Sequence, residues 1–196
     1  MKQNLPAKHL QKSILFAVIL FSLFSGNLLA QQAKTDSTKM NPAAAPSTSA
    51  PKTYPRAVGY LSFIVPVVAI DKDKTTWNFN GTTRIGFPVG VNVLYSDHFG
   101  FSYEFTPTIT ATSASSKVSN LLFDPGTMFR FEHGFTIITR LAFETAGRYG
   151  FTPVFNQVYA RTKYVNYFIA GSLPARFGNG APASIGFNVQ FGFTFN

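Results

Sequence analysis

The sequence predicts an all-β fold: an antiparallel up-and-down transmembrane β-barrel of eight strands, preceded by a signal-peptide helix and a disordered tether. Three observations support this expectation. Apolar and polar residues alternate with a period of two over most of residues 57–196, as strands with two unlike faces do. Phenylalanine is unusually common, with 22 copies beside 8 tyrosines and one tryptophan. Charged residues make up only 13% of the 196 residues, against about 25% in soluble proteins.

Composition also narrows the possible chemistry. The chain has no cysteine, which excludes disulfides, thiolate metal sites and a cysteine nucleophile. Its net charge of +9 comes largely from Lys2, Lys8 and Lys12 and from the lysines of the following polar segment. The remainder is nearly balanced and forms no basic run, so we expect no binding to nucleic acid.

Residues 1–30 have the charged, apolar and small-residue order of a secretory signal peptide. The apolar run of residues 13–24 is shorter than the roughly 20 residues of a spanning helix, although a retained membrane anchor is the alternative. Cleavage is expected after Ala30. Residues 31–56 are rich in Ala, Pro, Ser, Thr and Lys, and they predict a disordered periplasmic tether. A basic arm that touches the cell wall or a partner is the other interpretation of this segment.

Seven strands are clear from the alternation, and an eighth is weaker. In the weak segment, residues 148–160, Pro153 and Gln157 interrupt an otherwise apolar odd-numbered face. Single-chain barrels of this type have even strand numbers, so we expect eight strands. The seven clear segments are 57–70, 84–95, 99–110, 120–132, 135–144, 164–177 and 185–195.

The segments between the strands differ at the two ends. Residues 96–98 and 132–134 are tight turns, expected to face the periplasm, whereas residues 71–80 and 111–119 are expected to form longer outer loops. Short inner turns and longer outer loops are typical of outer-membrane barrels. Aromatic residues crowd the inner strand ends, as in an interfacial girdle.

Alternation alone does not decide which face points outward, because a lipocalin-like soluble barrel has its apolar face inside. Three features favour an apolar face directed into lipid. The interior of an eight-stranded barrel has no room for so many phenylalanines, and the strands lack lysine. The polar face carries charges of both signs, which suits an enclosed network of paired ions: Arg84, Arg130, Arg140 and Arg176 with Glu104, Asp124, Glu132 and Glu144.

The chain resembles small outer-membrane β-barrel proteins, such as the OmpX-like family and the transmembrane domain of OmpA, over about residues 57–196. The resemblance lies in the leader, the tether and the final strand, GFNVQFGFTFN. In such proteins the final strand resembles the signal read by the barrel-assembly machinery. Phe187, Phe191, Phe193 and Phe195 fit this signal, although the chain ends in Asn196 rather than in an aromatic residue. The resemblance implies an outer-membrane location, in contact with outer-membrane lipids.

Catalytic motifs are lacking in the barrel segment. His98 and His133 are expected in inner turns, and no G-x-S-x-G sequence accompanies them. Asp71 and Asp73 begin like a calcium loop, but Thr76 and Thr82 stand where an EF-hand needs Gly and Glu. We therefore expect no cofactor and no metal site.

The leading functional hypothesis is a non-enzymatic outer-membrane protein with a structural or surface-interaction role. Trp77 and Phe79 are the candidates for an outer-loop contact. A plugged, salt-bridged lumen formed by Arg84, Glu104, Asp124, Arg130, Arg140, Glu144 and Arg176 is favoured over a selectivity path. Two alternatives stay open: a narrow channel or small-ligand transport barrel, and a lipid-modifying enzyme. The sequence does not indicate an oligomeric state.

Overall fold

The computed structural model describes residues 52–195. The predicted signal peptide and the tether up to residue 51 lie outside the described residues, as does Asn196. Within the described part of the chain, no helix is long and apolar enough to cross a membrane.

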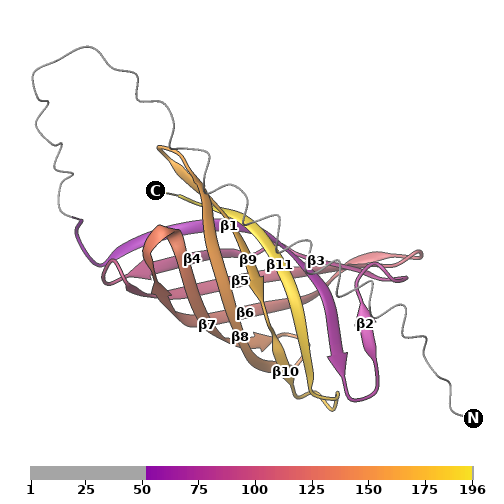
Figure 1. The fold of residues 1–196 in the computed structure, drawn as a ribbon. Coiled ribbons are helices and arrows are strands. Elements are labelled where there is room, and N and C mark those ends of the chain that lie inside the picture. The colour runs from indigo at the N-terminus through magenta and orange to yellow at the C-terminus, as the bar shows by residue number, and fades with distance from the viewer. Residues whose placement is uncertain (1–51, 196) are drawn as a thin grey trace, which may run out of the picture. The chain divides into compact units, whose positions relative to one another are not determined.

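The described residues form eleven strands and one short 3-10 turn (Figure 1). The strands are β1 (Arg56–Asp71), β2 (Thr75–Trp77), β3 (Thr83–Gly86), β4 (Val89–Leu94), β5 (Phe99–Ala111), β6 (Ser116–Arg130), β7 (Phe135–Glu144), β8 (Tyr149–Arg161), β9 (Val165–Ser172), β10 (Ala175–Phe177) and β11 (Ser184–Phe195), with η1 (Glu132–Gly134) between β6 and β7.

The strands close into a barrel because the first pairs with the last. β1 and β11 are antiparallel, in a register that runs from Tyr60 opposite Thr194 to Asp71 opposite Ser184. β3 and β4 lie end to end in a single strand position between β1 and β5, and pair with both. β2 also pairs with β1, so it belongs to the same strand position. β9 and β10 likewise share one place between β8 and β11. The ring therefore has eight strand positions, as the sequence predicts.

The segment that looked weakest in the sequence is a full strand. β8 pairs with β7 from Gln157 to Tyr149 and with β9 along its other edge. Pro153 fits because a proline still offers its carbonyl, which accepts a hydrogen bond from the Leu173 amide at 3.0 Å. The break between β3 and β4 also lies at a proline, Pro88, whose carbonyl accepts from the Ser62 amide at 2.9 Å.

The predicted length of the outer loops is wrong. Residues 111–119 are mostly strand, since β5 ends at Ala111 and β6 begins at Ser116. Residues 71–80 similarly contain β2. Polar residues such as Thr110, Ser116 and Lys117 break the alternation here, while the backbone pairing continues. The tight turns predicted at 96–98 and 132–134 are confirmed.

The two faces of the strands differ as predicted. Along β5, Tyr103 and Phe105 are 45% and 47% exposed, whereas Ser102 and Glu104 are 0% and 3% exposed. The same division recurs around the barrel, where large apolar side chains such as Val91, Leu141 and Phe191 are exposed on the outer wall. The apolar side therefore points outward, and the Gly, Thr, Arg and Glu side encloses the lumen.

One part of the interior is more apolar than the sequence indicated. A buried cluster lies in the part of the lumen nearer the barrel's two chain ends, where it lines the wall, and is formed by Tyr60, Leu94, Met128, Ile138, Val154, Phe168 and Ala170. These residues occupy the even-numbered face that the alternation marked as small or polar. Apolar side chains pack well in a confined space without needing a hydrogen-bond partner, so they can share the lumen with the polar groups described next.

Candidate functional site

A buried ion pair lies at the centre of the lumen. The Arg140 Nη1 atom lies 2.9 Å from the Glu104 Oε2 atom, and the two side chains are only 4% and 2% exposed. Glu104 projects inward from β5 and Arg140 from β7. Gly126 lies opposite Arg140 on β6, and a Cβ atom there would lie 2.8 Å from the Arg140 Cγ atom. A glycine is therefore needed beside this arginine.

Hydrogen bonds extend the ion pair across the lumen. The Tyr60 hydroxyl donates to Glu104 Oε2 at 2.8 Å, and Arg140 Nη2 donates to the Tyr60 and Ser102 hydroxyls at 3.0 and 3.1 Å. Gln190 Nε2 contacts Glu104 at 3.4 Å. We call Tyr60, Ser102, Glu104, Arg140 and Gln190 the central layer. Its members come from β1, β5, β7 and β11, so it ties together strands from around the ring.

Two further predicted residues, Arg176 and Glu144, form an ion pair on the side of the central layer that lies away from the chain ends. Arg176 Nε lies 2.7 Å from Glu144 Oε1, and its Nη1 atom donates to the Thr152 hydroxyl at 3.0 Å. The Arg176 and Glu144 side chains are 10% and 15% exposed. The structure thus brings four of the seven predicted lumen residues together as two ion pairs.

The other three predicted lumen residues are not paired. Asp124 lies beside Glu104 in the β5–β6 register and is buried, but its Oδ1 atom has no hydrogen-bond partner within the described chain. Arg84 is exposed and Arg130 is half-buried. Among residues 52–195 neither arginine forms an ion pair. For Arg84 and Arg130, the expectation that every interior ion finds a partner is wrong.

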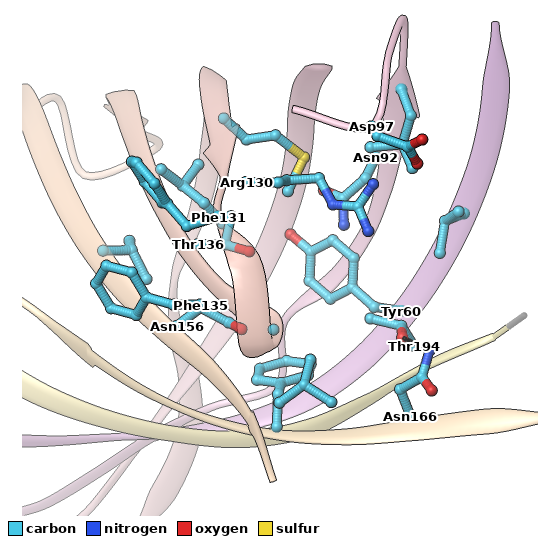
Figure 2. Close-up of a pocket in the computed structure, with 18 of the residues that line it drawn as sticks. Tyr60, Asn92, Asp97, Arg130, Phe131, Phe135, Thr136, Asn156, Asn166 and Thr194 are labelled. Carbon is cyan, nitrogen blue, oxygen red and sulfur yellow. Dashed lines mark hydrogen bonds between the residues drawn. The ribbon is translucent and has the colours of Figure 1, made fainter. Parts of the chain in front are cut away.

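The central layer separates two cavities. The termini-side cavity, of about 320 Å³, is lined by residues near the first and last strand ends, such as Arg56 and Thr194. Figure 2 shows this cavity, with Thr194 among the labelled residues. The hairpin-side cavity, of about 470 Å³, is lined by residues near the opposite ends, such as Lys117 and Arg148. Arg140, Val154 and Gln190 line both cavities. The lumen is therefore two vestibules with a hydrogen-bonded layer between them.

Residues 52–55, which precede β1, are attached at the rim of the termini-side cavity. Lys52 Nζ and the Tyr54 hydroxyl both donate to Asp97 Oδ1, at 2.7 and 2.6 Å. These two hydrogen bonds lower the pKa of the Asp97 carboxyl below its usual range. The same contact with Asp97 raises the pKa of Tyr54. Two residues assigned by sequence to the tether thus contact the turn between β4 and β5.

Several residues of the central layer were not singled out in the sequence. Tyr60 could have been noticed, because it is a large side chain on a strand face whose other residues are mostly small or polar. Gly90 on the neighbouring β4 strand makes room for it, because a Cβ there would overlap the Tyr60 ring. Gln190 and Ser102 carried no comparable signal, since uncharged polar residues are common along the inner face.

The predicted contact residues and histidines lie at the barrel ends. Trp77 and Phe79 are 49% and 64% exposed, and Phe79 has a positive φ of 66°. His133 lies in η1, and His98 Nδ1 lies 3.2 Å from the Arg130 carbonyl oxygen. Within residues 52–195, no group of three or more His, Cys, Asp or Glu side chains is placed to hold a metal ion.

No protein-family profile and no curated protein sequence matches the chain. Solved structures with a similar fold include a de novo designed transmembrane β-barrel, with 8% identity and a TM-score of 0.45 over 73% of this chain and 97% of that one. The outer membrane protein OprG from Pseudomonas aeruginosa shows 7% identity and a TM-score of 0.41, over 71% and 94% of the two chains. The designed barrel TMB2.3 shows 13% identity and a TM-score of 0.37, over 71% and 94%.

Proposed function

We propose that the protein is a non-enzymatic β-barrel of a bacterial outer membrane whose lumen is closed at rest, with a structural or surface-interaction role. The central layer is the observation that carries this proposal. A buried Glu104–Arg140 pair with three hydrogen-bonded neighbours occupies the place where a continuous pore would have to pass. A general diffusion pore of this class has about sixteen strands and an open lumen.

The location in a membrane is supported by the outer wall. Large apolar side chains are exposed around the barrel, and such a continuous apolar surface is not stable in water. Aromatic rings gather near the termini-side turns, where Phe99 contacts Phe129 and Phe131 contacts Phe135 at centroid distances of 5.6 and 5.7 Å. An aromatic belt at this level is typical of the membrane interface. We propose that the signal peptide exports the chain and that the Phe-rich final strand addresses it to the assembly machinery.

Cell fractionation with a heat-modifiability gel tests the location. The full chain, expressed in a Gram-negative host, should be recovered with outer membranes and should migrate differently before and after boiling. Recovery as a freely soluble monomer without detergent would contradict the proposal.

Surface interaction is proposed for the barrel end that carries Trp77 and Phe79, because both rings are exposed there. The narrow channel is the second candidate, and the two vestibules favour it, since Arg140, Val154 and Gln190 line both of them. Single-channel recording in planar bilayers distinguishes these functions. Sustained, reproducible openings of the wild-type protein would favour transport, whereas a silent bilayer supports the closed barrel.

A further inference from the structure

The termini-side cavity has an excess of positive charge. Among the described residues, the cationic side chains on its wall are Lys52, Arg56, Arg130, Arg140 and Arg161, and the one carboxylate is that of Asp97. Asp97 is already held by Lys52, at 2.7 Å, and Arg140 is compensated by Glu104.

Three guanidinium groups, those of Arg56, Arg130 and Arg161, are therefore left without an ion-pair partner in the part of the chain that the structure describes. Within residues 52–195, no hydrogen bond or ion pair is made by any of the three. Arg130 extends from the end of β6 toward the side of the cavity that holds Tyr60 and Asn92 (Figure 2). Guanidinium groups on the wall of one cavity repel one another, and an anion bound between them reduces that repulsion.

The hairpin-side cavity does not have this imbalance. It also has five cationic side chains, but Glu104, Asp124 and Glu144 supply three carboxylates on its wall. The termini-side cavity is therefore the more attractive one for an anion, because its five cations face one carboxylate, whereas the five cations of the hairpin-side cavity face three.

The inner end of the same cavity is apolar. Leu94, Met128, Ile138 and Phe168 belong to the buried cluster and line the cavity wall. Asn92 lies among them and is only 8% exposed, and its amide oxygen has no hydrogen-bond partner in the described chain. The oxygen and nitrogen of such an amide are assigned only by their partners, so this group is free to turn its NH2 toward a ligand.

We propose that the termini-side cavity binds a small organic anion, a carboxylate joined to a short hydrocarbon or aromatic group. The carboxylate contacts Arg130 and Arg56, and the apolar group packs against Met128 and Phe168. A guanidinium group suits this role because its planar array of donors matches a carboxylate in a bidentate arrangement. The volume of about 320 Å³ accommodates such a ligand, since ligand pockets begin at roughly that size. The inference goes beyond the proposed function and does not require conduction.

Calorimetric titration of the full chain folded in zwitterionic micelles tests the proposal with four probes. Phenylpropionate has both the charge and the apolar group, phenylpropanamide lacks the charge, acetate lacks the apolar group, and phosphate is an inorganic anion. We expect saturable binding of phenylpropionate, with affinity at least about tenfold above that of each other probe, because hydrogen bonds to charged groups and burial of a phenyl ring each exceed tenfold in effect.

Variants locate the site. Arg130→Gln should weaken phenylpropionate binding about tenfold or more. The affinity of Arg130→Lys for phenylpropionate should lie between those of Arg130→Gln and wild type. Arg84→Gln is the matched control, because Arg84 is also unpaired but lines the other cavity, and its affinity should match wild type. A heat-modifiability gel confirms that each variant is folded. If Arg130→Gln does not fold, Arg56→Gln and Arg161→Gln replace it, with the same expected loss.

Each contrary result overturns the proposal. Equal affinity for phenylpropionate and phenylpropanamide would show that charge is not recognised. Tighter binding of phosphate would make the site one for inorganic anions. Absence of saturable phenylpropionate binding, or unchanged affinity in every folded arginine variant, would show that the cavity is not the site.

Discussion

Replacing Glu104 by glutamine removes one charge from the middle of the barrel with little change of shape. Glu104 Oε2 accepts from Tyr60, Arg140 and Gln190, while Oε1 accepts from the Thr106 hydroxyl at 3.1 Å. A glutamine can keep its carbonyl oxygen at the first position and turn its NH2 toward Thr106, whose hydroxyl is also an acceptor. The substitution therefore isolates the loss of charge from the loss of hydrogen bonds.

The expected destabilisation follows from the burial of Arg140, whose side chain is 4% exposed. Breaking one side of a buried ion pair costs about 3–5 kcal/mol, because the remaining charge is left without compensation. We expect Glu104→Gln to lower the free energy of unfolding by about 3 kcal/mol, because its hydrogen bonds are kept, and Arg140→Met to lower it by a similar amount. The double variant holds neither charge, so its loss should also be about 3 kcal/mol, which gives a coupling energy of about 3 kcal/mol.

Urea unfolding in lipid vesicles measures these values. The single tryptophan, Trp77, reports unfolding by its emission, and the heat-modifiability gel reports the folded fraction independently. Arg84→Gln is the control and should change stability by less than about 0.5 kcal/mol, because Arg84 is exposed and unpaired. Additive losses in the double variant, or a loss below about 1 kcal/mol for Glu104→Gln, would refute the idea that the central pair is a buried, mutually dependent unit.

Three other outcomes are expected. Gly150→Ala should sharply lower the folded fraction on the gel, because the new Cβ would collide with the Ala175 carbonyl of the neighbouring strand; a wild-type yield would argue against this close approach. Leu141→Arg, on the outer wall, should cost about 2–4 kcal/mol in vesicles, and equal stability would place that wall outside lipid. The Lys52–Asp97 contact should persist above the ordinary carboxyl pKa and be lost as the pH falls through the lowered pKa of Asp97. The NMR signals of the segment before β1 should therefore shift in acid, and Asp97→Asn should show no such acid shift.

Much of the fold could be predicted because period-two alternation is a local property. Odd-numbered residues of β5, β7, β8 and β11 face outward as the sequence indicated. Alternation does not hold through the whole of β1, because the register shifts between Pro66 and Val68 and a bulge moves side chains to the opposite face. Strand ends were misjudged where polar residues interrupt the alternation, as in residues 111–119.

The central layer could not be assembled from the sequence in the same way. Arg140 contacts Tyr60 across 80 positions of the chain, and Gln190 contacts Glu104 across 86. Which inward residues meet depends on the stagger of the closed barrel, and alternation carries no information about stagger. The sequence therefore selected Arg84 and Arg130 as readily as Arg140, although of these three only Arg140 forms an ion pair within residues 52–195.

The closed barrel and the narrow channel differ in how often the central layer opens. If conduction requires the Glu104 and Arg140 side chains to separate within the lumen, a cost of about 3 kcal/mol leaves roughly one molecule in a hundred open. Glu104→Gln removes most of that cost, because Arg140 can then move toward either vestibule without parting from a charge. Openings in planar bilayers should therefore become more frequent in Glu104→Gln, by on the order of a hundredfold, with no change in Arg84→Gln. Identical traces from wild type and Glu104→Gln would mean that the layer supports the barrel without controlling passage, and the channel hypothesis would lose its only gate.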